Sequence, residues 1–131
     1  MSIQISFDGS CTINPGGIGY YGFTIHKNGA LLKAGNGEIG SNPEMSNNVA
    51  EYYGVLKALE HLDSVGEYSK ITIMGDSQLI VNQLNGKWRV KSKNLKTLYN
   101  KVVKLLKKRS YEISWIPREQ NKEADLMSKL R

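Results

Sequence analysis

The sequence has few of the residues that build disulfide-bonded or membrane-embedded proteins. Its 131 residues include a single cysteine, Cys11, which excludes an internal disulfide and favours a reducing compartment. No hydrophobic run approaches the roughly 20 residues that a bilayer-spanning helix needs. The first ten residues also lack the basic and apolar segments of a secretion signal. We therefore expect a cytoplasmic protein with no membrane partner.

Histidine is almost as scarce, with only His26 and His61 in the chain. A catalytic thiol needs a nearby base to activate it. Neither histidine lies in a local context that would pair it with Cys11, so we do not expect a cysteine nucleophile.

Acidic residues are outnumbered, with 12 Asp and Glu against 18 Lys and Arg, and the net charge of +6 suits a nucleic-acid partner. Small basic proteins are common, so the charge alone leaves the partner open. The basic residues form two clusters, one around Trp88 and one further along the chain. The clusters are Lys87, Arg89, Lys91, Lys93 and Lys96, and then Lys101, Lys104, Lys107, Lys108 and Arg109.

The length and the absence of linkers or repeats predict one domain over residues 1–131, and nothing calls for more than a monomer. Period-two alternation, turn residues such as Asn28-Gly29, and helical spacing of apolar residues define the expected elements. These are strands at 3–8, 18–27 and 30–40, a helix from residues 46–48 to about 62, a strand at 70–76, helices at 76–86 and from about 92 to 109, a strand at 111–117 and a helix at about 120–130.

This order predicts an α/β fold with a mixed five-stranded sheet. The first three strands are expected to be antiparallel. The last two follow helices, so they should join parallel to the first strand through right-handed crossovers, with helices on both faces of the sheet.

Four carboxylates lie in four separate sequence contexts: Asp8, Glu51, Asp76 and Asp125. On a helix, Val55, Ala58 and Leu62 fall within about 40° of Glu51. A carboxylate in such an apolar stripe needs a partner when it is buried. A metal ion is one partner. A salt bridge, or an exposed position on a largely apolar helix, explains the same pattern equally well.

The other three acids also have ordinary explanations when each is taken alone. Asp76 follows a strand and precedes a helix, a place where sites collect in open α/β sheets, but helix capping is the favoured role for an isolated Asp there. Asp8 precedes Gly9 and could be a turn residue. Asp125 could be a solvated residue of the last helix.

Together, the segments FDGSC and NPGGIG, NNVAEYYGVLKALE, IMGDSQLIVNQLNGKWRVKSKNL, and ISWIPREQNKEADLMSKL resemble type 1 ribonuclease H, most closely its reverse-transcriptase-like group. The resemblance covers essentially the whole chain and implies the ribonuclease H-like fold. It also implies an endoribonuclease that hydrolyses the RNA strand of RNA–DNA hybrids and leaves 5′-phosphate and 3′-hydroxyl ends.

By motif position, Asp8, Glu51, Asp76 and Asp125 would bind two Mg²⁺ ions, for which Mn²⁺ often substitutes. Asp8 would bridge both ions, Glu51 and Asp76 would serve the first, and Asp125 the second.

The resemblance also implies a set of substrate contacts. RNA would be recognised through its 2′-hydroxyls, and the matching residues are Gly9, Ser10, Cys11, Asn14, Glu51 and Gln78. Asn47 and Asn48 match a pair near the DNA strand, although either could also cap a helix. Lys87, Trp88 and Arg89 lie where the family contacts the DNA backbone, and a half-buried core position is the other explanation for Trp88.

Two departures from the family pattern bear on mechanism and specificity. Many members have a histidine in the loop before the last aspartate, but here that loop is IPREQNKEAD, and Arg118 is the nearest replacement. An arginine cannot act as a base, so it would bind phosphate or stabilise the leaving group. Glu119 could supply a base, or it could simply lie near the start of the last helix.

The segment after Trp88 is also too short for the basic protrusion of some bacterial members. Activity on double-stranded RNA therefore remains open, as does a non-catalytic hybrid-binding module.

Overall fold

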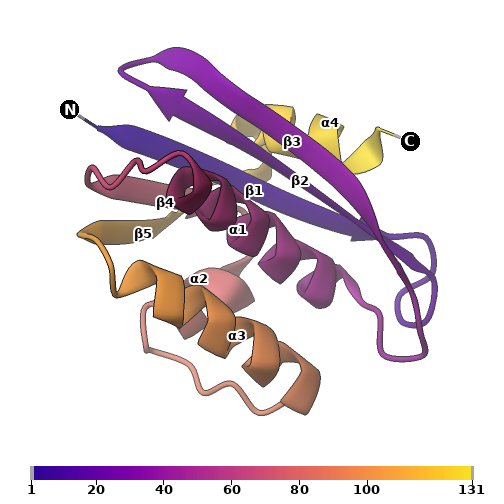
Figure 1. Cartoon of the computed structure of the whole chain (residues 1–131). Coiled ribbons are helices and arrows are strands. Elements are labelled where there is room, and N and C mark those ends of the chain that lie inside the picture. The colour runs from indigo at the N-terminus through magenta and orange to yellow at the C-terminus, as the bar shows by residue number, and fades with distance from the viewer. Residues whose placement is uncertain (1, 131) are drawn as a thin grey trace.

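The computed structural model describes residues 2–130, and its elements follow the expected order (Figure 1). A short 3₁₀ turn at Arg118–Gln120 precedes the last helix. The elements are β1 (Ile3–Cys11), β2 (Ile18–Lys27), β3 (Ala30–Ser41), α1 (Asn47–Ser64), β4 (Ile71–Gly75), α2 (Gln78–Leu84), α3 (Lys93–Leu106), β5 (Tyr111–Trp115) and α4 (Lys122–Lys129).

The five strands form one mixed sheet in the order β3-β2-β1-β4-β5. β1, β2 and β3 are antiparallel neighbours, whereas β4 is parallel to β1 and β5 is parallel to β4. Asn28 and Gly29 make the tight turn between β2 and β3 with φ angles of 53° and 82°, a backbone region that Asn and Gly tolerate best. The predicted topology is therefore confirmed.

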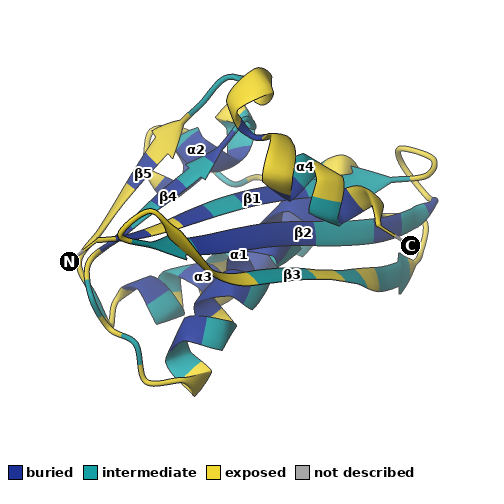
Figure 2. Ribbon diagram, turned by 90° about the horizontal axis from the view of Figure 1, so that it is seen from above, coloured by how far each residue is buried: buried dark blue, intermediate teal, exposed yellow. Residues whose placement is uncertain are grey.

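Helices cover both faces of the sheet, as predicted. α1 and α3 lie on one face and α4 lies on the other, above β1 and β2 in the view of Figure 2. The alternating residues Ile3, Ile5 and Phe7 of β1 are buried beneath α1. Gly54 lets α1 approach closely, because a Cβ there would lie 2.9 Å from the carbonyl oxygen of Gly22 and 3.0 Å from that of Asp8.

Side chains within each helix explain where it begins and which face it buries. Ser46 caps α1, and its hydroxyl accepts a hydrogen bond from the Val49 N–H at 3.2 Å. α3 buries Leu95, Leu98 and Val102 against the core at helical spacing. Among the described residues, no helix is both long and apolar enough to cross a membrane.

Candidate active site

The sheet topology brings acids from distant parts of the chain to one edge of the sheet. β1 and β4 are parallel neighbours in which Ser6 lies beside Met74; two residues further along the chain come Asp8, still in β1, and Asp76, the residue after β4. Parallel strands end at the same edge, which is where open α/β sheets collect their sites. Glu51 reaches this edge from the start of α1 on one face of the sheet, and Asp125 reaches it from α4 on the other.

Three of the acids are close enough to share a cation. One carboxylate oxygen from each of Asp8, Glu51 and Asp76 lies within 4.8 Å of the others. Asp8 and Glu51 are buried, with exposed fractions of 7% and 9%. Asp125 joins the group through a hydrogen bond with Asp8, and the Lys129 ammonium lies 3.2 Å from its carboxylate. Such oxygen clusters are typical of divalent cation sites.

The acids perturb one another strongly. Burial, followed by the charges of Asp8 and Asp76, raises the pKa of Glu51 from 4.5 to about 8. Burial and the hydrogen bond with Asp125 likewise raise the pKa of Asp8. Burial raises the pKa of Asp76, although the Arg118 charge opposes this. Three acids therefore resist ionisation together unless positive charge is added between them.

Asp125 behaves differently from the other three acids. Burial raises the pKa of Asp125, but its hydrogen bond with Asp8 and its ion pair with Lys129 outweigh burial, so the pKa ends below its usual value.

Ser77, rather than Asp76, caps α2. The Ser77 hydroxyl accepts a hydrogen bond from the Ile80 N–H at 3.2 Å. The capping role favoured for Asp76 in isolation is therefore wrong, and its carboxylate is available to the cluster. Ser77 also lowers the pKa of Glu51, against the effect of burial, so the residue that caps α2 acts on the acid of α1.

Asn121, which was not predicted as a site residue, contacts or acts on the segments that carry Asp8, Asp76 and Asp125. Its side chain is buried, and its Nδ2 donates to the Phe7 carbonyl at 2.9 Å, next to Asp8 in β1. The same side chain helps to lower the pKa of Asp76, and the Asn121 backbone carbonyl accepts a hydrogen bond from the Asp125 N–H at 3.0 Å. The sequence feature that could have indicated this role is an Asn at the start of the last helix, four residues before Asp125.

The acids lie in an open cleft of about 520 Å³. The predicted site residues that line it with the four acids are Gly9, Ser10, Asn14, Asn47, Asn48 and Arg118. The Asn14 side-chain oxygen accepts a hydrogen bond from the Asn47 N–H at 3.2 Å, which ties the β1–β2 loop to the start of α1. Because Ser46 provides the cap of α1, the side chains of Asn47 and Asn48 are left to face the cleft.

The lining also includes residues that had not been predicted. Ser77, Trp115 and Lys129 all contribute. The indole N–H of Trp115 donates to the Asp76 carbonyl at 3.1 Å, which fixes the backbone at the end of β4.

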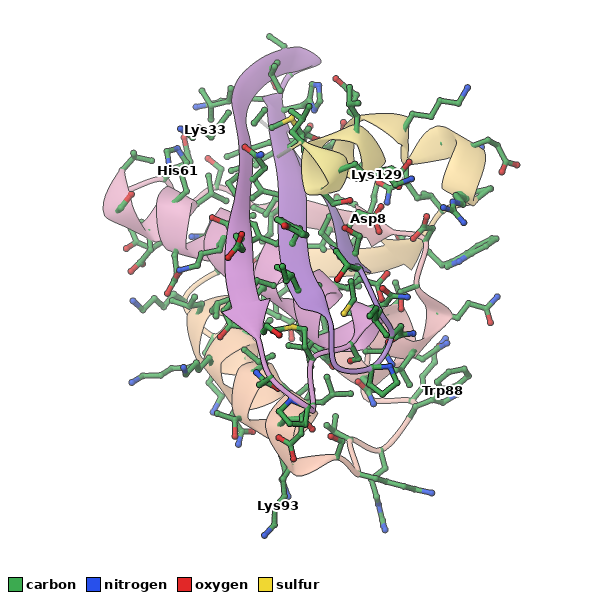
Figure 3. The ribbon with its side chains drawn as sticks, turned by 90° about the vertical axis from the view of Figure 1, so that its right-hand side faces the viewer. Asp8, Lys33, His61, Trp88, Lys93 and Lys129 are labelled. Carbon is green, nitrogen blue, oxygen red and sulfur yellow. The ribbon has the colours of Figure 1, made fainter. Side chains whose placement is uncertain are left out.

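The other predicted substrate residues lie outside this lining. The Cys11 thiol donates to the Ile13 carbonyl, and Gln78 is exposed on α2. Lys87, Trp88 and Arg89, here called the Trp88 cluster, line two depressions of about 450 and 570 Å³ beside α2 and α3. Trp88 is 47% exposed, so it is not a core aromatic. Figure 3 shows Asp8 and Trp88 on the same side of the molecule.

Neither histidine lines the cleft. His26 lies 3.6 Å from Glu123, and His61 lies near the far end of α1 (Figure 3). Arg118 is the basic residue at the position expected for a loop histidine, and its charge acts on both Asp76 and Asp125.

Comparison with known proteins gives relatives along nearly the whole chain. The family described as Reverse transcriptase-like matches residues 6–130. A bifunctional protein of Mycobacterium tuberculosis is 32% identical over 98% of this chain, and a ribonuclease HI of Halobacterium salinarum is 31% identical over 96%. The chain spans only 35% of the first relative's length and 62% of the second's.

Solved structures agree with the fold. The N-terminal ribonuclease H domain of the mycobacterial protein has a TM-score of 0.88 at 31% identity, covering 97% of this chain and 95% of that one. LC11 ribonuclease H1, crystallised with an RNA/DNA hybrid, has a TM-score of 0.87 at 33% identity, covering 95% and 92%.

Proposed function

Because the chain belongs to the reverse transcriptase-like family, we propose that it is a ribonuclease H that hydrolyses the RNA strand of RNA–DNA hybrids. The convergence of Asp8, Glu51 and Asp76 within 4.8 Å carries this proposal. A protein that only binds a polyanion gains nothing from buried acids facing it, because like charges repel. The relatives named ribonuclease HI, and the LC11 enzyme bound to an RNA/DNA hybrid, support the same substrate class.

The residues present fit divalent metal ions. Mg²⁺ prefers a few carboxylates together with water and substrate phosphate, and the open cleft leaves room for both. Asp8, Glu51 and Asp76 would hold one ion, and Asp8 with Asp125 would hold a second, with Mn²⁺ as a substitute. Such a pair, when bound, activates a water and stabilises the leaving 3′ oxygen, giving a 5′-phosphate product.

The remaining cleft residues would orient the substrate. A guanidinium has donors and no acceptor, so Arg118 would bind a phosphate or the leaving group rather than accept a proton. The backbone at Gly9 and Ser10 and the side chain of Asn14 would contact the RNA strand through its 2′-hydroxyls. Asn47 and Asn48 would lie against the DNA strand.

Replacing Asp76 with Asn tests this function. The substitution keeps the shape of the side chain but removes one anionic ligand, so we expect Asp76→Asn to abolish cleavage of a labelled hybrid in Mg²⁺ while largely preserving binding. Asp63→Asn, at a surface pair with Lys108, is a matched control that should cut normally. Mg²⁺-dependent cutting by pure Asp76→Asn protein would reject the assignment.

Substrate choice needs its own assay, because double-stranded RNA is still an open alternative. Hybrid, duplex RNA and duplex DNA of one sequence should be incubated side by side with Mg²⁺, Mn²⁺ or EDTA. We expect cutting of the hybrid only, and only with metal. Equal cutting of duplex RNA would broaden the activity, whereas no cutting under any metal would favour a non-catalytic binding module.

A further inference from the structure

The positive charge of this protein is concentrated in one part of the chain. Between Asp76 and Glu112 the sequence has ten Lys and Arg residues and no acidic residue. The rest of the chain has eight basic residues against twelve acidic ones, so outside this segment the protein is net negative. The segment comprises α2, the Trp88 cluster and α3.

Within the segment, α3 presents its lysines on a single face. At 100° per residue, the lysines of this face fall within an arc of about 140°, opposite the buried stripe of Leu95, Leu98, Val102 and Leu106. All of them are exposed. We call this set the lysine face; it consists of Lys93, Lys96, Lys101, Lys104 and Lys107.

The lysine face takes no part in the ion pairs of the described residues, although Lys101 and Glu44 line one depression. Among the described residues none of its five lysines makes an ion pair, whereas the neighbouring Lys108 lies 3.1 Å from Asp63. Natural helices usually intersperse both signs, because like charges at i,i+3 and i,i+4 destabilise a helix. This face carries that repulsion along a helix of about 20 Å.

The lysine face is continuous with the Trp88 cluster. Lys96 lines the same depression of about 450 Å³ as Trp88 and Arg89. In Figure 3, Trp88 and Lys93 lie in the lower part of the view, whereas Lys33 lies at the upper left, away from both. Positive charge therefore extends from the Trp88 cluster along α3.

We propose that the lysine face of α3 binds the phosphate backbone of the nucleic-acid duplex beyond the cleft. This inference rests on the proposed ribonuclease H function, which supplies the duplex. A polyanion fits better than an acidic protein because the face presents exposed ammonium groups along the length of the helix with no apolar anchor among them. A length of about 20 Å corresponds to the phosphates of roughly six further base pairs.

A pair of charge-matched variants tests the proposal. Lys101→Gln/Lys104→Gln removes two charges from the lysine face, beyond the Trp88 cluster, and Gln keeps a high helix propensity. Lys33→Gln/Lys57→Gln removes two charges from β3 and α1. Thermal melts check that both proteins are folded, and hybrid binding is measured in EDTA over a range of salt concentrations.

The α3 variant should bind the hybrid about tenfold more weakly at low salt, and its slope of log affinity against log salt should fall by roughly 1–2. The control should match the wild type in both quantities. Equal losses of hybrid affinity in both variants would show an effect of total charge. No loss of affinity in the α3 variant would show that the lysine face does not bind the hybrid. Either result overturns the proposal while hybrid cleavage by the wild type still stands. A wild type that neither binds nor cuts hybrids would instead reject the proposed function.

Discussion

Replacing Glu51 with Gln should stabilise the metal-free protein at alkaline pH. The pKa of Glu51 rises from 4.5 to about 8 because burial and the charges of Asp8 and Asp76 oppose its ionisation. A group that binds its proton more tightly in the folded state contributes most stability below its unfolded pKa, and this contribution is lost as pH rises through the folded pKa. The wild type should therefore lose stability between about pH 4.5 and pH 8.

The size of the effect follows from the gap between the two pKa values. Each pH unit of separation is worth about 1.4 kcal/mol, so ionising Glu51 in the folded protein costs on the order of 4 kcal/mol at pH 8. Gln has nearly the same volume and no charge. The variant should thus melt about 15 °C higher than the wild type at pH 8 in EDTA, and the two should converge near pH 5.

Thermal or urea unfolding in EDTA from pH 5 to pH 8.5 measures this difference. Glu60→Gln, on the exposed side of the same helix, is the control and should change stability by less than about 0.5 kcal/mol at every pH. Mg²⁺ should narrow the difference, because ligand binding stabilises the wild type by about 2.7 kcal/mol at 100 times its Kd and the variant lacks a ligand. The reasoning fails if wild-type stability in EDTA is flat over this range, or if Glu51→Gln is the less stable protein at pH 8.

Two further predictions concern Asn121 and Glu67. Asn121→Ala leaves the buried Phe7 carbonyl without a donor, so it should lower stability by about 1–3 kcal/mol and also raise the Mg²⁺ concentration needed for half-maximal activity, which a purely structural defect would not change. The ion pair with Lys27 at 2.8 Å, followed by bonds from Ser69, lowers the pKa of Glu67 to about 2, so this acid stabilises the fold above pH 4.5 and loses its effect as pH falls toward 2. Glu67→Gln should therefore melt lower than the wild type at pH 5 and converge with it near pH 2; equal melting curves at pH 5 would contradict this.

Most of the fold could be predicted from the sequence, because local patterns identified the elements and their order indicated the sheet topology. The alternation of Ile3, Ile5 and Phe7, the Asn28-Gly29 turn and the stripe on α3 each identify one element, and a helix between two strands allows the right-handed crossover that makes them parallel. These patterns depend on neighbours within a few residues, so a single sequence reveals them.

The details of the site depend on contacts between distant elements, which a single sequence does not show. Asp76 and Ser77 are both good caps, and only the start of α2 decides that Ser77 takes the role. Glu51 fits a salt bridge as well as a metal until Asp8 and Asp76 are placed beside it. Asn121 looks like an ordinary residue at a helix start until its amide is found on the carbonyl of Phe7, 114 positions away.

The acidic cleft and the basic segment have a common physical consequence. Ionising Glu51 opposes folding, and the lysine face adds like-charge repulsion along α3, so each lowers the stability of the isolated protein. A bound divalent cation would relieve the cost of ionising Glu51, and a bound polyanion would relieve the repulsion along α3, because whatever binds only the folded state adds its binding energy to stability. The two ligands should also assist each other, because a phosphate in the cleft completes the coordination of the metal while the metal cancels the acids that would repel it. Mg²⁺ should therefore bind more tightly when a hybrid is present, and calorimetric titration of Asp76→Asn, which lacks one ligand, should show this coupling reduced.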